Sequence, residues 1–111
     1  MPAPGDVLDT LGMWDATAAL PEQVRDAAAA ARGLDVALPS RDGIRNVVML
    51  GMGGSGIAGD VVREIAGPFM PVPVVVHKGY GIPNFIDAST LVFAVSFSGN
   101  TEETVQAAAD A

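Results

Sequence analysis

Three short apolar runs, each bounded by turn residues, are the feature that most constrains the fold of this chain. They occupy residues 46–50, 72–76 and 91–95, and each is nearly continuous instead of alternating between apolar and polar positions. Continuous runs of this length are typical of strands that are buried on both faces of a parallel sheet. We therefore expect three parallel strands.

Helical patterns separate and follow these runs. Residues 57–65 place four branched apolar side chains on one helical stripe, and residues 101–111 continue a helical pattern after the third run. The second and third runs are joined by residues 78–89, a short segment with glycines and a proline that is a loop or a single turn. This order of elements predicts an α/β fold with a doubly wound parallel sheet.

The first forty residues have a different character. Apolar residues recur at helical spacing over residues 6–14, and a second helix is expected over residues 21–31. A polar linker with turn residues follows at 34–43. We accordingly divide the chain into a helical preface with its linker, residues 1–40, and an α/β part, residues 41–111.

The α/β part is expected to be incomplete. Its last helical pattern continues to Ala111 without a stop signal, and a doubly wound sheet usually has more than three strands. The unpaired edge strands of a three-stranded parallel sheet also favour pairing with additional strands from a longer polypeptide. We expect this chain to be a fragment, the N-terminal part of a longer protein.

The composition argues against several classes of function. Thirteen acidic and six scattered basic residues give a net charge of −7, which leaves no basic stripe for nucleic acid. The chain has no cysteine and one histidine, His77, so we expect no metal site. We also expect no secretory leader, because the N-terminus lacks a basic region followed by an apolar run. We expect no membrane span, because no apolar run approaches about 20 residues. The default expectation is a soluble cytoplasmic protein.

The first segment that carries chemistry is the turn Gly-Met-Gly-Gly-Ser-Gly at residues 51–56. It follows a predicted strand and opens a helix, so the free N–H groups of the helix start form an anion site. The glycines let a ligand approach the backbone closely, and Ser55 adds a hydroxyl beside the free amides.

Two other interpretations of this turn stay open. Gly51, Gly53 and Gly56 fit the spacing of dinucleotide-binding folds, which expect an acidic residue at the end of the second strand. That place holds His77 and Lys78, although Lys78 could meet the phosphate of NADP. Alternatively, the glycines serve only close packing in a tight turn.

The second segment is the loop Ser-Phe-Ser-Gly-Asn-Thr at residues 96–101, which follows the third run. Ser96, Ser98 and Thr101 can each donate a hydrogen bond to one phosphate, and the following helix start adds amides. The alternative is an ordinary helix start in which Asn100 caps the helix in a capping box with Glu103.

His77 stands at the end of the second run, where an imidazole could assist ring opening or proton transfer. A histidine at a strand end is more often structural, so we assign it no catalytic role.

Together, the two segments resemble the sugar isomerase (SIS) domain family. Within that family the chain is most similar to the N-terminal part of the bifunctional phosphoglucose/phosphomannose isomerases, because of Leu-Pro-Glu-Gln at residues 20–23 and Tyr-Gly-Ile-Pro at 80–83. The resemblance implies a flavodoxin-like fold. It also implies that Gly53, Gly54 and Ser55 line the sugar phosphate.

The resemblance further implies that Ser96, Ser98 and Thr101 grip the phosphate. The activity implied is that of an aldose–ketose isomerase interconverting glucose 6-phosphate or mannose 6-phosphate with fructose 6-phosphate, without a cofactor. Its catalytic base and histidine are expected beyond Ala111, so the catalytic residues are unknown and this chain alone is expected to be inactive. The full-length form is expected to be a homodimer.

Two alternatives to the isomerase remain. One is a non-catalytic SIS module that senses a phosphosugar, and the other is an NADP-binding Rossmann domain.

Overall fold

The computed structural model describes residues 9–111, and the chain divides into two compact units, Met1–Leu38 and Pro39–Ala111. Each unit is described by itself. The predictions made for residues 1–8, including most of the first expected helix, lie outside the described residues.

The first unit contains two helices, α1 (Met13–Ala18) and α2 (Leu20–Arg32). The helix predicted over residues 21–31 is confirmed, and it is one residue longer at each end. The helix predicted over residues 6–14 is wrong for residues 9–12, because Gly12 is left-handed (φ 68°) and the Asp9 carboxylate accepts bonds from the first amides of α1. Neither helix has a buried residue.

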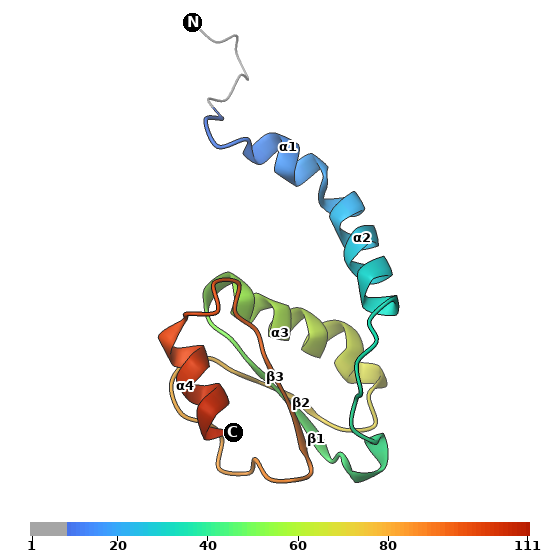
Figure 1. The fold of residues 1–111 in the computed structure, drawn as a ribbon, viewed down its shortest axis with the longest axis vertical. Helices are drawn as coiled ribbons and strands as arrows, with labels where there is room; N and C mark the ends of the chain where they lie inside the picture. Colours follow the sequence, from blue (N-terminus) through green and yellow to red (C-terminus); the bar gives the residue numbers. More distant parts are fainter. Residues whose placement is uncertain (1–8) are drawn as a thin grey trace, which may run out of the picture. The chain divides into compact units, whose positions relative to one another are not determined.

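The second unit is a three-layer α/β structure (Figure 1). Its elements are β1 (Asn46–Leu50), α3 (Gly53–Ala66), β2 (Val74–His77), β3 (Thr90–Ala94) and α4 (Glu102–Asp110), with 3-10 turns η1 (Arg41–Gly43) and η2 (Gly67–Phe69). The strands pair in parallel in the order β2-β1-β3, so β1 is central. The predicted fold class, an α/β fold with a parallel sheet, is confirmed.

Helices cover both faces of the sheet because side chains alternate along β1. Val47 and Met49 belong to the cluster on the α3 side, whereas Val48 and Leu50 pack with Ala107 of α4 on the other side. The expectation of strands buried on both faces holds for β1 alone. β2 and β3 are only partly buried, because they are the outer strands.

Helix α3 lies unusually close to the sheet. A Cβ built on Gly59 would stand 2.9 Å from Cβ of Met49 and 3.2 Å from Cγ1 of Val76. The branched residues of the predicted stripe do not make this contact, since all four are exposed: Ile57, Val61, Val62 and Ile65. The packed face of α3 is therefore made by glycines.

The crossover at residues 78–89 contains no helix. Its Ile82 and Ile86 pack against the cluster of Val48 and Leu50. A loop thus supplies the apolar cover that a crossover helix would otherwise give to this part of the sheet.

We expect Gly59→Val to destabilise the second unit by about 1–3 kcal/mol, because the added side chain must displace Met49 and Val76. Chemical denaturation with urea measures this change. Ala58→Val is the matched control, since Ala58 is the neighbouring exposed residue of the same helix. Equal stability of the two variants would contradict the close packing of α3.

Candidate functional site

The two segments that sequence analysis singled out lie next to each other at the carboxyl edge of the sheet. The Gly51 amide donates to the carbonyl of His77 at 3.4 Å, and the Val95 amide donates to the carbonyl of Leu50 at 2.8 Å. These bonds extend the strand pairing past β1 on both sides. The glycine turn (residues 51–56), which follows β1, and the hydroxyl loop (residues 96–101), which follows β3, therefore start side by side.

The glycine turn presents free backbone donors. Helix α3 begins at Gly53, its cap residue Met52 gives no side-chain hydrogen bond, and the Gly56 amide makes the bond to Met52 at 3.0 Å. The amides of Gly53, Gly54 and Ser55 precede that bond and have no partner within the helix. They form the positive end of the helix dipole.

The glycines of this turn divide into two kinds. Gly51 and Gly56 are packed against each other, since a Cβ on either would stand 3.1–3.2 Å from the other's backbone. A Cβ on Gly53 or Gly54 would meet nothing within 4 Å, and Gly53 needs its left-handed φ of 54°. Close packing thus explains the first pair only, while the second pair borders open space.

One hydrogen bond joins the two segments directly. The Phe97 amide donates to Oγ of Ser55 at 3.2 Å, across 42 positions in the sequence. The Phe97 side chain itself is fully exposed. Ser55 therefore fixes the tip of the hydroxyl loop against the start of α3.

Hydroxyls also organise the second loop. Oγ of Ser96 accepts from the Gly99 amide at 3.0 Å and is hydrogen-bonded to Oγ1 of Thr101 at 3.1 Å. Oγ of Ser98 accepts from the Asn100 amide at 3.1 Å. Of the three predicted hydroxyls, these bonds bring Ser96 and Thr101 together, whereas Ser98 is bonded to Asn100. Gly99 allows the tight turn between them with a φ of 70°.

The alternative of an Asn100 capping box is wrong. The cap residue of α4 is Thr101, no side chain caps the helix, and the Asn100 side chain bonds back to the Ser98 carbonyl. The Thr101 hydroxyl is directed to Ser96 instead. The first amides of α4 consequently lack a side-chain acceptor, as those of α3 do.

The pattern of these bonds determines what the hydroxyls can still do. Ser55 and Ser98 each accept a bond from an amide, and a hydroxyl that accepts keeps its own proton as a donor. Free hydroxyl and amide donors therefore converge on one edge of the sheet. Such a set suits a phosphate or another oxyanion.

The nearest basic side chain of the glycine turn, Lys78, is paired. Its Nζ lies 2.5 Å from Oδ2 of Asp60, and this ammonium holds the pKa of the Asp60 carboxyl below its usual range. The prediction that Lys78 could meet an NADP phosphate gains no support from this pairing. His77 lies at the same edge, where its Nε2 is 3.2 Å from the Tyr80 carbonyl oxygen.

Glu102, at the start of α4, affects the ionisation of Tyr80. Partial burial raises the pKa of the Tyr80 phenol, and the carboxylates of Glu102 and Glu103 raise it further. Glu102 itself is exposed, so its carboxylate at the start of α4 can be replaced without disturbing the core.

Sequence reasoning missed two features of this edge. The hydrogen bond between Ser55 and Phe97 joins segments that are distant in the sequence, and no local sequence pattern predicts it. The pairing of Asp60 with Lys78 was also not predicted. Gly59 could have been found, because it extends a glycine spacing of three from Gly53 and Gly56 along one helix face.

Two kinds of feature are absent from residues 9–111. No group of three or more histidine, cysteine or acidic side chains is placed to hold a metal ion. No helix in that range has the length and apolarity needed to cross a membrane.

The second unit is thus a parallel α/β domain whose first and third strands each end in a turn suited to an anion. The whole chain is 39% identical over 99 residues to the bifunctional phosphoglucose/phosphomannose isomerase of Caldicellulosiruptor bescii, a match that covers 89% of this chain and 29% of that protein. It is 52% identical over 66 residues to the enzyme of the same name from Thermoplasma acidophilum, covering 60% and 20%. The predicted resemblance to the bifunctional phosphoglucose/phosphomannose isomerases is confirmed.

A different enzyme is also similar to this chain. The D-glucosamine-6-phosphate 4-epimerase of Sulfolobus acidocaldarius is 35% identical over 68 residues, which cover 61% of this chain and 21% of that protein. No family model matches the chain, and no solved structure matches it significantly. The chain spans less than a third of the length of each of these relatives.

Tyr80 is the only tyrosine of the chain, so its titration can be followed by ultraviolet absorbance. We expect it to ionise above pH 10.0, and Glu102→Gln to lower its pKa toward that value. Since the folded state holds this proton more tightly than the unfolded state, stability should fall as the pH rises past 10.0. The urea-unfolded chain gives the reference pKa of Tyr80. An unchanged Tyr80 pKa in Glu102→Gln would place Glu102 away from Tyr80.

Proposed function

We propose that the carboxyl edge of this sheet holds the phosphate of a phosphorylated sugar, as the substrate-binding part of a sugar-phosphate isomerase with an SIS domain. The observation that carries the proposal is the bond between Oγ of Ser55 and the Phe97 amide, which joins the glycine turn to the hydroxyl loop. It joins the turn that contains Gly53, Gly54 and Ser55 to the loop that contains Ser96, Ser98 and Thr101, which supports a single ligand bound by both segments.

The donor set favours a phosphate over an uncharged sugar hydroxyl. Two helix starts lie at the same edge, each with first-turn amides that have no side-chain cap. Their dipoles and amides favour a group with negative charge and several acceptor oxygens. Each hydrogen bond to a charged group contributes about 1.5–3 kcal/mol.

The names of the relatives support a phosphosugar more strongly than any one reaction. Four of the similar proteins are named phosphoglucose/phosphomannose isomerases, and the fifth is named as an epimerase of glucosamine 6-phosphate. A phosphorylated hexose is common to all these names, whereas the bond that changes differs. We infer that this chain takes a hexose phosphate.

For the reaction, we propose the interconversion of glucose 6-phosphate or mannose 6-phosphate with fructose 6-phosphate. Such an isomerisation needs a base that moves a proton between C1 and C2 of the open sugar. We assign this base to no residue of the chain. The residues at the sheet edge contribute by fixing the phosphate, which holds the reacting carbons in place.

Isothermal calorimetry of the chain with fructose 6-phosphate tests the proposal. We expect saturable binding that inorganic phosphate competes for, and no binding of NADPH. Binding of NADPH without binding of fructose 6-phosphate would overturn the proposal and favour a dinucleotide site.

We expect Ser98→Ala to weaken the binding of fructose 6-phosphate by about 1–2 kcal/mol, or about fivefold to thirtyfold, because it removes one donor to the phosphate. Calorimetry measures this loss. Ser89→Ala is the matched control, since Ser89 is also a hydroxyl residue in a polar turn but precedes β3 at the opposite edge. Equal affinities of the two variants would remove Ser98 from the site.

A further inference from the structure

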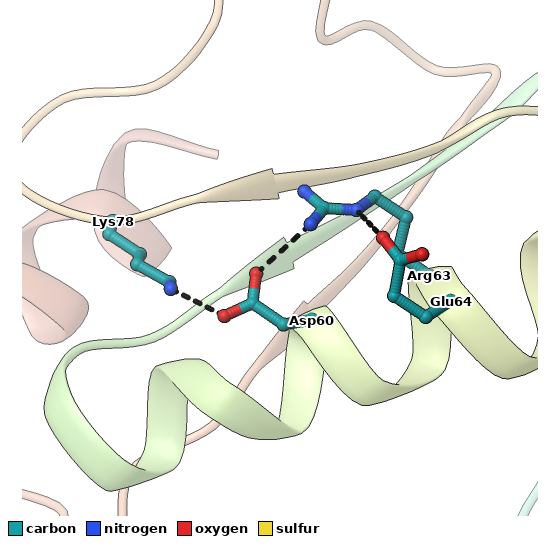
Figure 2. A network of polar contacts seen from close by, with 4 residues as sticks. All are labelled: Asp60, Arg63, Glu64 and Lys78. Atoms are coloured by element: carbon teal, nitrogen blue, oxygen red, sulfur yellow. Dashed lines mark hydrogen bonds and ion pairs between the residues drawn. The ribbon is translucent and has the colours of Figure 1, made fainter.

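An ion pair joins helix α3 to the end of β2 (Figure 2). Oδ2 of Asp60 lies 2.5 Å from Nζ of Lys78, and the other oxygen of Asp60 faces Nη2 of Arg63 at 3.5 Å. Arg63 in turn contacts Glu64 at 3.1 Å. The contacts of Arg63 stay within α3, so within the network of Figure 2 the pair of Asp60 and Lys78 alone connects the helix to the sheet.

Helix α3 lacks the side-chain interdigitation that normally fixes a helix on a sheet. Its packed face carries Gly56 and Gly59, which are buried, while its branched apolar residues are exposed. Glycines allow a close approach, but they offer no ridge that resists sliding or rotation of the helix. A polar contact between helix and sheet therefore carries more of the positioning here than it would in a well-interdigitated interface.

The Lys78 side chain also touches the first turn of α3. A Cβ built on Gly56 would lie 3.2 Å from Cε of Lys78, so the lysine stem passes directly over this glycine. Gly56 is the residue whose amide makes the bond to Met52, directly after the three free amides. Lys78 thus contacts the helix directly after its free amides and is paired with it one turn later.

We propose that Lys78 and Asp60 are positioning residues of the phosphosugar site, whose ion pair fixes the first turn of α3 and its free amides at the carboxyl edge of the sheet. The ligand in this inference rests on the proposed function. Neither residue is assigned a contact with the sugar phosphate. The ammonium of Lys78 is directed to Asp60, and the two charges compensate each other locally.

Two single variants distinguish positioning from a direct effect of charge. A purely electrostatic effect predicts that Lys78→Met weakens the binding of an anion and that Asp60→Asn strengthens it. Positioning predicts that both variants weaken the binding of fructose 6-phosphate, by about twofold to fivefold each. It also predicts that the double variant is no weaker than either single one, because one interaction is lost only once.

The controls use the same network. Glu64→Gln removes a contact that stays within α3 and should leave the affinity unchanged. Lys78→Arg keeps the charge facing Asp60 and should restore most of the affinity. Thermal unfolding of each variant shows that it is folded, and the melting temperature should change by only a few degrees because the pair is partly exposed.

The inference and the proposed function can fail separately. If the unmodified chain binds fructose 6-phosphate and Lys78→Met binds it equally well, or Asp60→Asn binds it more tightly, the positioning role is wrong. If the unmodified chain binds no phosphosugar, the proposed function is wrong, and amide NMR signals then decide the inference. Signals of Gly53 and Gly54 should shift in Lys78→Met and stay unchanged in Glu64→Gln, and their constancy in both would overturn it.

Discussion

The close approach of α3 to the central strand is the contact on which the rest of the second unit depends. It requires glycine where helix and sheet meet, because a Cβ at position 59 would overlap Met49 and one at position 56 would press on Gly51. This approach brings the start of α3 to the end of β1, beside the end of β3. Only then can the Ser55 hydroxyl accept a hydrogen bond from the Phe97 amide. The site therefore follows from the packing of the fold.

The hydroxyls of the site serve two purposes that do not compete. As acceptors, Ser55, Ser96 and Ser98 hold the two segments in shape through amide donors. As donors, Ser55 and Ser98 still have a proton to give, and one proton of the pair of Ser96 and Thr101 is used in the bond between them. A structural role for these serines is thus no argument against phosphate binding. The glycines of the turn also have two roles. Gly51 and Gly56 allow close packing, and Gly53 and Gly54 leave open space beside the backbone.

Sequence patterns predicted the parts of this structure that depend on local chemistry. The central strand was predicted with its observed bounds, because a continuous apolar run between a polar linker and glycine is a strong local signal. Both turns were also predicted to follow strands, as they do, since glycine and hydroxyl residues at the end of an apolar run are a local signal. The first helix was misplaced because its start depends on the left-handed Gly12 and on the Asp9 carboxylate, which apolar spacing does not reveal.

The features that sequence could not supply all involve partners that are distant along the chain. The outward direction of the stripe on α3 is one example, because periodicity shows that a helix has an apolar face but not that glycines occupy the packed one. The contacts of Ser55 with Phe97 and of Asp60 with Lys78 are others, at separations of 42 and 18 positions. Such pairs are fixed by the register of the strands, which brings the ends of β1, β2 and β3 to one edge.

This difference between local and distant features also explains why the ligand is better supported than the reaction. In the proposed site, a phosphate is held by amides and hydroxyls of two turns, and each turn can be recognised by itself. The reaction depends on groups that face the sugar carbons, and the relatives are named for two different reactions. Fixing the phosphate lowers the barrier of either one, because binding energy from a part of the substrate that does not react still orients the part that does. A phosphate site of this kind therefore constrains the substrate class while leaving the chemistry to other residues.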